Sequence, residues 1–303
     1  MKKYIIVFNL LVTMMVFSQS DPKLSIFSYN PLQYNPAYAG AFDGLSVTGI
    51  YSSQWVGFEG APKTLFFSAH SNVIEREIGV GINITSDKLG PVQDNQIVGN
   101  FAYNVYLNDE ISLNLGLKAG LDNFTLDYRL LSIENPDEAG IFEGTLNQYS
   151  PIIGAGLYVS NQKAYVGISV PNLIKTNFQT ASQISIANTK PSYYLTAGYK
   201  FEIQDQVYLV PNILTRATAG APICNLVSLN LDYQSKLLAS VNFQPASSFG
   251  GFIGYRLKNN FSFGYAYDSS INNFSTVNSG CHTFYLNFRI DDLLSNHYGF
   301  GTF

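Results

Sequence analysis

Charged residues are scarce in this 303-residue chain: Lys, Arg, Asp and Glu together make up 13% of it, about half the usual share. A water-soluble protein needs more charge than this to cover its surface. Aromatic residues, in contrast, reach 15%. The net charge of −4 and the lack of a basic cluster argue against nucleic acid as a partner.

Long apolar runs are also missing. After the N-terminus, no stretch has the roughly 18 uninterrupted apolar residues that a membrane-spanning helix needs. The mean hydropathy is +0.06, so apolar and polar residues are finely mixed rather than grouped in blocks. Fine mixing with many aromatics and little charge is the composition of a transmembrane β-barrel.

Cysteine and histidine are few, which leaves little material for metal or redox chemistry. Cys224 and Cys281 are the two cysteines, and they belong to no CxxC or Cys/His cluster. Ser68 and His70 share one face of an expected strand, but a single such pair does not make a catalytic site. The sequence therefore indicates a protein that is not an enzyme and that carries neither cofactor nor metal.

The N-terminus indicates export. Two lysines precede an apolar run over residues 4–17, and the small residue Ser18 follows. This pattern predicts a secretory signal peptide, residues 1–18, that is removed after Ser18. We expect residues 19–43 to form a lead-in segment, residues 44–290 a transmembrane β-barrel, and residues 291–303 a C-terminal periplasmic tail.

Hydrophobicity alternates with period two in segment after segment. Between residues 111 and 121, the odd positions are apolar and the even positions are Ser112, Asn114, Gly116, Lys118 and Gly120. Such alternation predicts strands with one apolar and one polar face. Fourteen segments follow this pattern: 44–54, 63–71, 77–86, 96–107, 111–122, 151–159, 163–171, 191–202, 206–216, 224–234, 237–244, 248–257, 260–268 and 281–290.

The links between these segments alternate in length. Every second link is short: 72–76, 108–110, 160–162, 203–205, 235–236 and 258–259. The links between them are mostly longer: 87–95, 123–150, 172–190, 217–223 and 269–280. Short periplasmic turns and long extracellular loops are typical of outer-membrane barrels. We therefore expect an all-β fold, a single barrel of about 14 antiparallel strands in the outer membrane of a Gram-negative bacterium.

In such a barrel the polar face of each strand lines the lumen. A Lys or Arg that faced lipid at the bilayer midplane would cost about 2–4 kcal/mol, so charged strand residues are expected to point inward. These residues are Lys118, Lys200, Glu202, Asp232, Arg256 and Arg289. Many lumenal positions are glycine, which leaves room for something inside: Gly79, Gly81, Gly116, Gly154, Gly156, Gly254 and Gly264.

The same register predicts the state of the cysteines. Cys224 and Cys281 begin the tenth and fourteenth expected strands, both with lumenal parity near the outer rim. Four strand spacings of about 4.8 Å each separate them, whereas the Cα atoms of a disulfide lie within about 7 Å. We expect two free thiols.

One stretch of sequence carries a family resemblance. Residues 30–70 contain an Asn-Pro-Ala-Tyr-Ala-Gly motif, a Gln-Trp pair and a Gly-Ala-Pro turn, and residues 79–90 form a glycine-rich strand that ends in an Asp and a Gly. The chain thereby resembles the PorP/SprF family of outer-membrane proteins of the type IX secretion system and gliding motility machinery in Bacteroidota. The positions that carry the resemblance are Asn35, Pro36, Ala37, Tyr38, Ala39, Gly40, Gln54, Trp55, Gly60, Ala61, Pro62, Thr64, Ser68, Asp87, Gly90 and, in the last hairpin, His282.

The resemblance implies a non-enzymatic component of the secretion machinery. It implies assistance in the export or surface attachment of a large, adhesin-like secreted partner, or contact with periplasmic secretion-ring components. Two positions depart from the family pattern: Cys281 stands where a small hydroxyl residue is expected, and Thr283 where an acid is expected. A passive or substrate-specific outer-membrane pore is the alternative function.

Trp55, the only tryptophan in the chain, lies in the first expected outer turn, and two interpretations stay open. Its ring belongs to the aromatic belt at the membrane interface, or the turn is a rigid platform for a secreted partner. Gly57 and Gly60 are expected to supply positive φ, and Pro62 to stiffen the exit. The motif at residues 35–40 precedes the first strand, as a periplasmic or lumen-entering segment.

The two longest outer links contain apolar residues that suggest a docking surface for the C-terminal region of a secreted protein. Alternatively, the loops fold over the mouth of the barrel and bury these residues against each other. The residues are Leu130, Leu131, Ile133, Ile141, Phe142, Leu173, Ile174, Phe178, Ile184 and Ile186.

Overall fold

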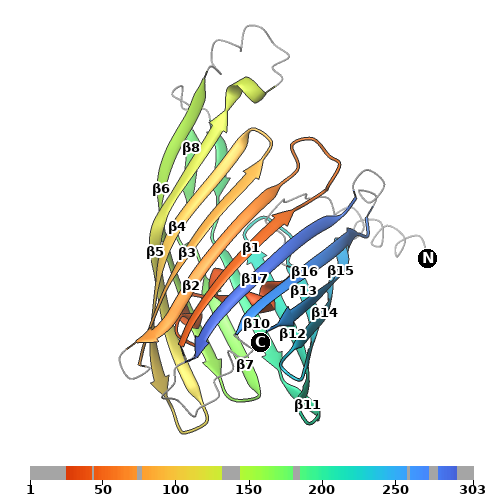
Figure 1. Ribbon diagram of the computed structural model, residues 1–303. Helices are drawn as coiled ribbons and strands as arrows, with labels where there is room; N and C mark the ends of the chain where they lie inside the picture. Colours follow the sequence, from red (N-terminus) through yellow and green to blue (C-terminus); the bar gives the residue numbers. More distant parts are fainter. Residues whose placement is uncertain are drawn as a thin grey trace, which may run out of the picture.

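The computed structural model describes residues 25–42, 44–73, 77–131, 144–179, 185–257, 260–272 and 279–291. Within these ranges, 14 antiparallel strands close into one barrel (Figure 1). They are β1 (Gly44–Ser53), β2 (Lys63–Val73), β3 (Ile78–Leu89), β4 (Val92–Tyr106), β5 (Ser112–Asp127), β6 (Thr145–Ser160), β7 (Ala164–Val170), β10 (Ser192–Tyr199), β12 (Val207–Thr218), β13 (Cys224–Tyr233), β14 (Leu237–Gln244), β15 (Ser248–Arg256), β16 (Phe261–Ser270) and β17 (Cys281–Asp291).

Each of these fourteen strands pairs with the next one in the series, and the pairing of β1 with β17 closes the wall. β1 pairs with β17 from Gly44 opposite Asp291 to Ser53 opposite His282. β10 pairs with both β7 and β12, and the short β11 (Phe201–Gln204) continues β10 along β12. The expected barrel is confirmed, and each of the fourteen expected segments is a strand.

The faces of the strands follow the sequence pattern. On β5, Leu115, Leu117 and Leu121 are exposed on the outer face, whereas Asn114 and Lys118 are buried on the lumenal face. Apolar residues can face lipid without cost, and polar groups find partners or water in the lumen. Asp232 is likewise buried and Lys200, Arg256 and Arg289 are half-buried, whereas Glu202 is exposed.

The wall is taller on one side than the sequence pattern indicates. Figure 1 shows β3 to β6 rising above the other strands. The long link expected at 87–95 is wrong, because β3 and β4 continue until only Gly90 and Pro91 join them. The expected link 123–150 is also shorter, since β5 runs to Asp127 and β6 begins at Thr145. Above the apolar belt the outer face turns polar, as at Asn95 and Asn123, and on β5 the lumenal face turns apolar at Phe124 and Leu126. The regular alternation of the lower part of the strands therefore ends while the strands go on.

A second, two-stranded sheet stands at the mouth of the barrel. β8 (Thr176–Gln179) and β9 (Ser185–Thr189) form a hairpin in the link between β7 and β10. The Phe178 ring is buried and stacks on Phe124, with ring centroids 4.3 Å apart. Phe178 is therefore no part of an exposed docking surface, in agreement with the alternative in which the loops fold over the mouth.

Several other apolar residues of the two long loops are more exposed than Phe178. Leu130 and Leu131 are exposed, by 62% and 39%, as is Leu173, while Ile174 is half-buried. Ile133, Ile141, Phe142 and Ile184 lie outside the described residues, as do the expected signal peptide and the chain beyond Asp291.

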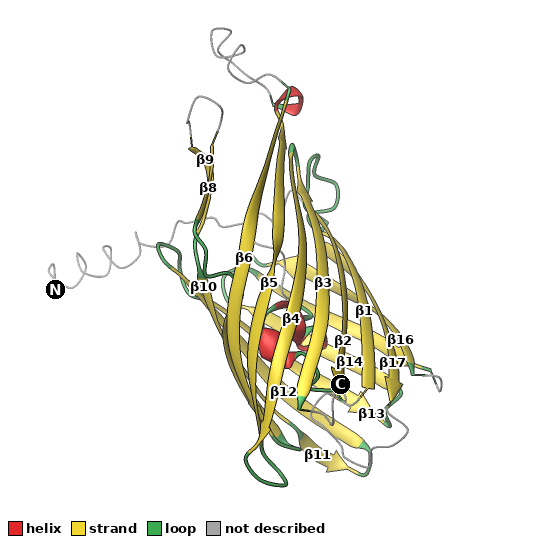
Figure 2. Ribbon diagram, turned by 90° about the vertical axis from the view of Figure 1, so that its left-hand side faces the viewer, coloured by secondary structure: helices red, strands yellow, loops and turns green. Residues whose placement is uncertain are grey.

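Residues 25–42 lie inside the barrel, and we call them the lumenal plug. They fold into three short 3-10 helices, η1 (Phe27–Tyr29), η2 (Pro31–Gln33) and η3 (Pro36–Tyr38). Figure 2 shows these helices enclosed by the strands. A fourth, η4 (Tyr128–Leu130), follows β5. No helix in the described part of the chain is long and apolar enough to cross a bilayer.

Candidate functional site

The lumenal plug rests on a row of small residues that crosses five strands. In register across β3 to β7, this row consists of Gly79, Ala102, Gly116, Gly156 and Ser169, and we call it the plug seat. An added Cβ at Gly79 would overlap the carbonyl oxygen of Ala39, and one at Gly116 would overlap the backbone nitrogen of Ala37. The plug backbone therefore lies directly against the wall. Of the lumenal glycines expected to leave room for something inside, Gly79, Gly81, Gly116 and Gly156 face the plug, whereas Gly154 faces Pro171, and Gly254 and Gly264 face the Phe252 ring.

The sequence Asn35-Pro36-Ala37-Tyr38 fits this seat through its local structure. Asn35 caps η3, since its Oδ1 accepts a hydrogen bond from the Ala37 N–H at 3.0 Å. Its Nδ2 donates to the Leu157 carbonyl on β6 at 2.9 Å. Pro36 opens the helix, where it has no N–H to lose. After Ala39, Gly40 takes a φ of 69°, which turns the chain toward β1.

Wall side chains complete the backbone hydrogen bonding of the plug. The Asn83 and Asn114 amides donate to the carbonyls of Leu32 and Ala37, at 3.1 and 3.2 Å. The Ser169 hydroxyl donates to the Tyr34 carbonyl at 2.7 Å. A buried backbone carbonyl without a partner would cost about 1–3 kcal/mol, so these side chains hold the plug in one position.

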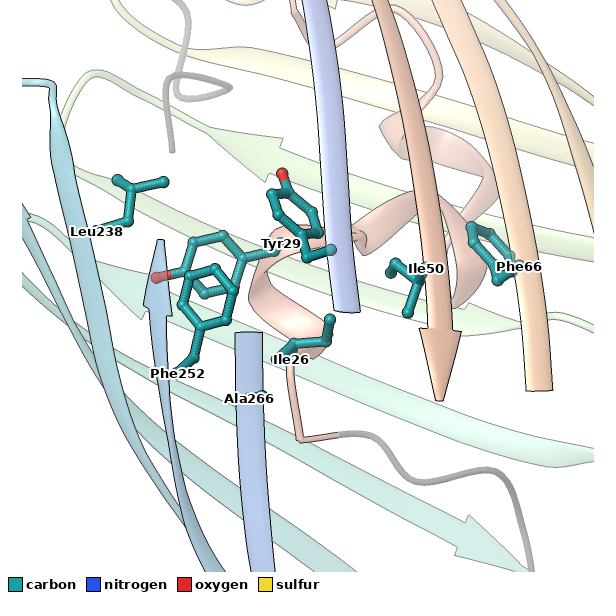
Figure 3. Packing of buried hydrophobic residues seen from close by; sticks show 8 residues of the cluster. Ile26, Tyr29, Ile50, Phe66, Leu238, Phe252 and Ala266 are labelled. Carbon is teal, nitrogen blue, oxygen red and sulfur yellow. The ribbon is translucent and has the colours of Figure 1, made fainter. Parts of the chain in front are cut away.

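Plug aromatics fill the rest of the lumen. The Tyr29 ring lies 4.5 Å from the Phe252 ring, and the Tyr38 ring meets Tyr158 edge-on at 5.5 Å. Burial raises the pKa of the Tyr29 and Tyr38 phenols, which therefore stay neutral. Ile26 and Tyr29 lie among Ile50, Phe66, Leu238, Phe252 and Ala266 (Figure 3). Tyr285 belongs to the same cluster.

One cavity lies between the plug and the wall. It is bordered by His70, Asn287 and Arg289 and has a volume of about 30 Å³. That volume suits one or two water molecules rather than an organic ligand. Nor do three or more His, Cys, Asp or Glu residues gather to hold a metal ion in the described ranges.

A second group of family positions meets at the outer rim, where three turns are joined; we call these contacts the rim clasp. The Gly90 N–H donates to the Gly60 carbonyl at 2.8 Å, which links the β3–β4 turn to the β1–β2 turn. Below it, the Thr64 hydroxyl donates to the Asp87 carboxylate at 2.5 Å. On the other side, the Val56 N–H donates to the Gly280 carbonyl at 3.1 Å.

The turn that contains Trp55 begins this clasp. Gln54 is buried, and its N–H donates to the Pro62 carbonyl at 2.9 Å, closing the turn with Ala61 inside it. Gly57 and Gly60 have φ values of 95° and 75°, as expected. Trp55 itself has a φ of 47°, which the sequence does not indicate, because a bulky residue rarely takes this conformation.

The two histidines in the described residues, His70 and His282, each lie against a tyrosine ring. Ser68 and His70 both face the lumen, but the Ser68 hydroxyl donates to Asn30 at 3.4 Å and the His70 ring packs against Tyr38. His282, expected at the rim, is the second residue of β17; its Nδ1 lies 2.6 Å from the Tyr265 hydroxyl on the outer face. No Ser–His pair forms within the described residues.

Neither Cys224 nor Cys281 forms a disulfide within the described residues, as expected. Cys224 lies 3.2 Å from the Gln244 amide and Cys281 lies 3.5 Å from the Ser52 hydroxyl. The two thiols thus have separate polar neighbours and do not contact each other.

Sequence reasoning missed two things about this site. Ala102 and Ser169 belong to the plug seat but to no motif, and they align with the glycines only once strand register is known. The pairs Gly60–Gly90 and Thr64–Asp87 are likewise separated by 30 and 23 residues, so their contact follows from register rather than from spacing along the chain.

Comparison with known proteins identifies a family and a fold. Residues 16–288 match the family model of the type IX secretion system membrane protein PorP/SprF. No curated protein matches the sequence. Among solved structures, the toluene transporter TbuX of Ralstonia pickettii has a TM-score of 0.51 at 10% identity, over 84% of this chain and 92% of that chain. The Acinetobacter baumannii outer membrane protein Omp33 gives 0.47 at 9% identity, over 83% and 100%.

At 10% identity the likeness to TbuX supports the fold alone, an outer-membrane barrel. The family match spans nearly the whole chain, plug seat and rim clasp included. The protein belongs to the PorP/SprF family and is an outer-membrane β-barrel component of the type IX secretion system.

Proposed function

We propose that this barrel is a closed docking component that assists the export or surface attachment of a large, adhesin-like secreted protein. The observation that carries the proposal is the filled lumen. Residues 25–42 occupy it with backbone-to-wall contacts and buried aromatics. A barrel filled in this way binds partners at its two ends rather than conducting solutes through its lumen.

The extracellular end supplies the surface for the secreted partner in this proposal. The rim clasp fixes three turns relative to one another, so the rim is rigid where the family positions gather. Leu130 and Leu131 stand exposed at the top of the tall wall. A rigid rim beside exposed apolar residues favours a protein partner. The periplasmic turns are then free to contact secretion-ring components.

A paired experiment tests this role in the native bacterium. Deletion of residues 130–142, or the milder change Leu130→Ser with Leu131→Ser, is expected to leave the barrel folded and to move one large protein from the cell surface to the medium. Quantitative proteomics of both fractions measures this. The matched control is Ile223→Ser, an apolar residue with 66% exposure in a different link of the same rim. Retention of every large surface protein in the leucine variants contradicts the proposal.

The alternative function, a passive or substrate-specific pore, makes the opposite forecast for the purified protein. A docking barrel with a seated plug is expected to show no conductance in planar bilayers. Steady ion conductance in the unmodified protein would favour the pore.

A further inference from the structure

The outer face of the tall wall changes character in three successive rows. In register across β2 to β6, the highest fully apolar row is Phe67, Ile84, Ile97, Leu121 and Pro151. The next row is Leu65, Ser86, Asn95, Asn123 and Tyr149, and the one above it is Lys63, Lys88, Gln93, Thr125 and Asn147. The lipid-facing belt thus continues upward, without a break in the sheet, into a polar band.

Two lysines open this band side by side. Lys63 on β2 and Lys88 on β3 are directly opposite each other and both exposed. Cβ atoms of such cross-strand pairs lie about 4.5–5.5 Å apart, and like charges there destabilise the sheet. Within the described part of the chain, neither ammonium group has an ion-pair or hydrogen-bond partner.

The position of Lys63 and Lys88 relative to the membrane indicates which kind of group would compensate their charges. Leu65, one row below Lys63 on the same strand, is 56% exposed to lipid. The ammonium groups therefore extend from the upper border of the apolar belt, at the level of the headgroups. By the rule for outer-membrane barrels, this end with the longer links faces outward.

Polar neighbours extend the site along the same band. The Ser86 hydroxyl donates to Asn95 at 2.7 Å, and Asn123 donates to Asn147 at 2.5 Å. Tyr149 stands at the far end, 71% exposed. Amide and hydroxyl groups beside an exposed aromatic ring can hydrogen-bond and stack on sugars.

We propose that Lys63 and Lys88 clamp a phosphate group of an outer-leaflet glycolipid, with its sugars lying along the polar band of β3 to β6. A phosphate group bound between the two ammonium groups offsets their mutual repulsion, because its oxygens accept a charge-assisted hydrogen bond from each of them. The site goes beyond the proposed function and does not depend on it, because it lies on the lipid-facing side of the wall.

The test uses the purified full-length protein in an uncharged detergent. It is titrated with a bisphosphorylated glycolipid, lipid A, and with the same lipid after removal of its phosphates, and bound lipid is counted by native mass spectrometry. The double variant K63Q/K88Q is expected to bind lipid A about 25-fold more weakly, since one lysine near a charged surface contributes about fivefold. The control K163Q/K236Q removes two exposed lysines from turns at the other end.

A thermal measurement gives a second readout that a merely structural role would not move. Without glycolipid, Lys88→Gln is expected to raise the melting temperature by relieving repulsion. With lipid A present, the melting temperature of the Lys88→Gln variant is expected to lie below that of the unmodified protein, because the variant has lost a phosphate contact. The proposal is wrong if the sign of the change in melting temperature does not reverse. It is also wrong if the protein binds the dephosphorylated lipid as tightly as lipid A, or if K163Q/K236Q loses as much affinity as K63Q/K88Q. The same holds if inorganic phosphate stabilises the protein as much as lipid A does.

Discussion

At the scale of single residues, the plug seat places tight limits on side-chain size. Gly116 lies against the backbone of Ala37, so even one methyl group there has no space. We expect Gly116→Ala to lift the plug, to lower the melting temperature and to produce ion conductance. Overpacking of this kind costs about 1–3 kcal/mol, occasionally more. Heat-dependent migration on SDS gels and planar-bilayer recording measure the two effects.

The control for this change is Gly99→Ala on β4. An added Cβ at Gly99 meets its nearest atom, the Ala119 carbonyl oxygen, at 3.8 Å, an ordinary contact. Equal behaviour of the two alanine variants would mean that the seat does not position the plug.

The rim clasp can be tested at the same scale. Thr64→Val removes the donor of the 2.5 Å hydrogen bond between these residues, and Asp87→Ala removes its acceptor. Hydrogen bonds to charged groups contribute about 1.5–3 kcal/mol, so each single change is expected to destabilise the barrel. In a double-mutant cycle of equilibrium unfolding, the pair should show a coupling of about 1 kcal/mol. Strict additivity would count against the clasp.

At the scale of elements, the buried Phe178 ring joins the β8–β9 hairpin to the wall of the barrel. Phe178 contributes to a cluster with Phe124, Leu126 and Tyr128 at the top of β5. We expect Phe178→Ala to release the hairpin, so that the link between β7 and β10 is cut faster by protease while the barrel melts unchanged. Leu173→Ala, at an exposed position of the same link, should leave the cleavage rate as it is.

The tall wall shows where element prediction from sequence ends. Alternation identifies strands wherever one face meets lipid, as on β5 from Leu113 to Leu121. Beyond the bilayer the alternation reverses its phase: Asn123 and Thr125 on the outer face are polar, whereas Phe124 and Leu126 on the lumenal face are apolar and buried, and the strand runs to Asp127. The plug is a similar case, because its short 3-10 turns have no periodicity and only the lumenal glycines announce it.

At the scale of the whole molecule, the barrel behaves as a single closed sheet around a core of its own chain. Closure between β1 and β17 over ten residue pairs leaves no free edge at the chain ends. We expect heat-modifiable migration on SDS gels and β-type circular dichroism that depends on detergent or lipid. A water-soluble, helical product would contradict the fold.

The plug seat also constrains how sequences in this family can drift. A contact between two side chains, such as Tyr38 with Tyr158, can be rebuilt by compensating changes on both sides. Gly156 faces the side chain of Asn35 and can vary together with it. Gly79 and Gly116 face backbone atoms of Ala39 and Ala37, which no substitution in the plug can remove. These two glycines should therefore stay fixed among relatives that keep the plug, and should vary only where the plug is lost.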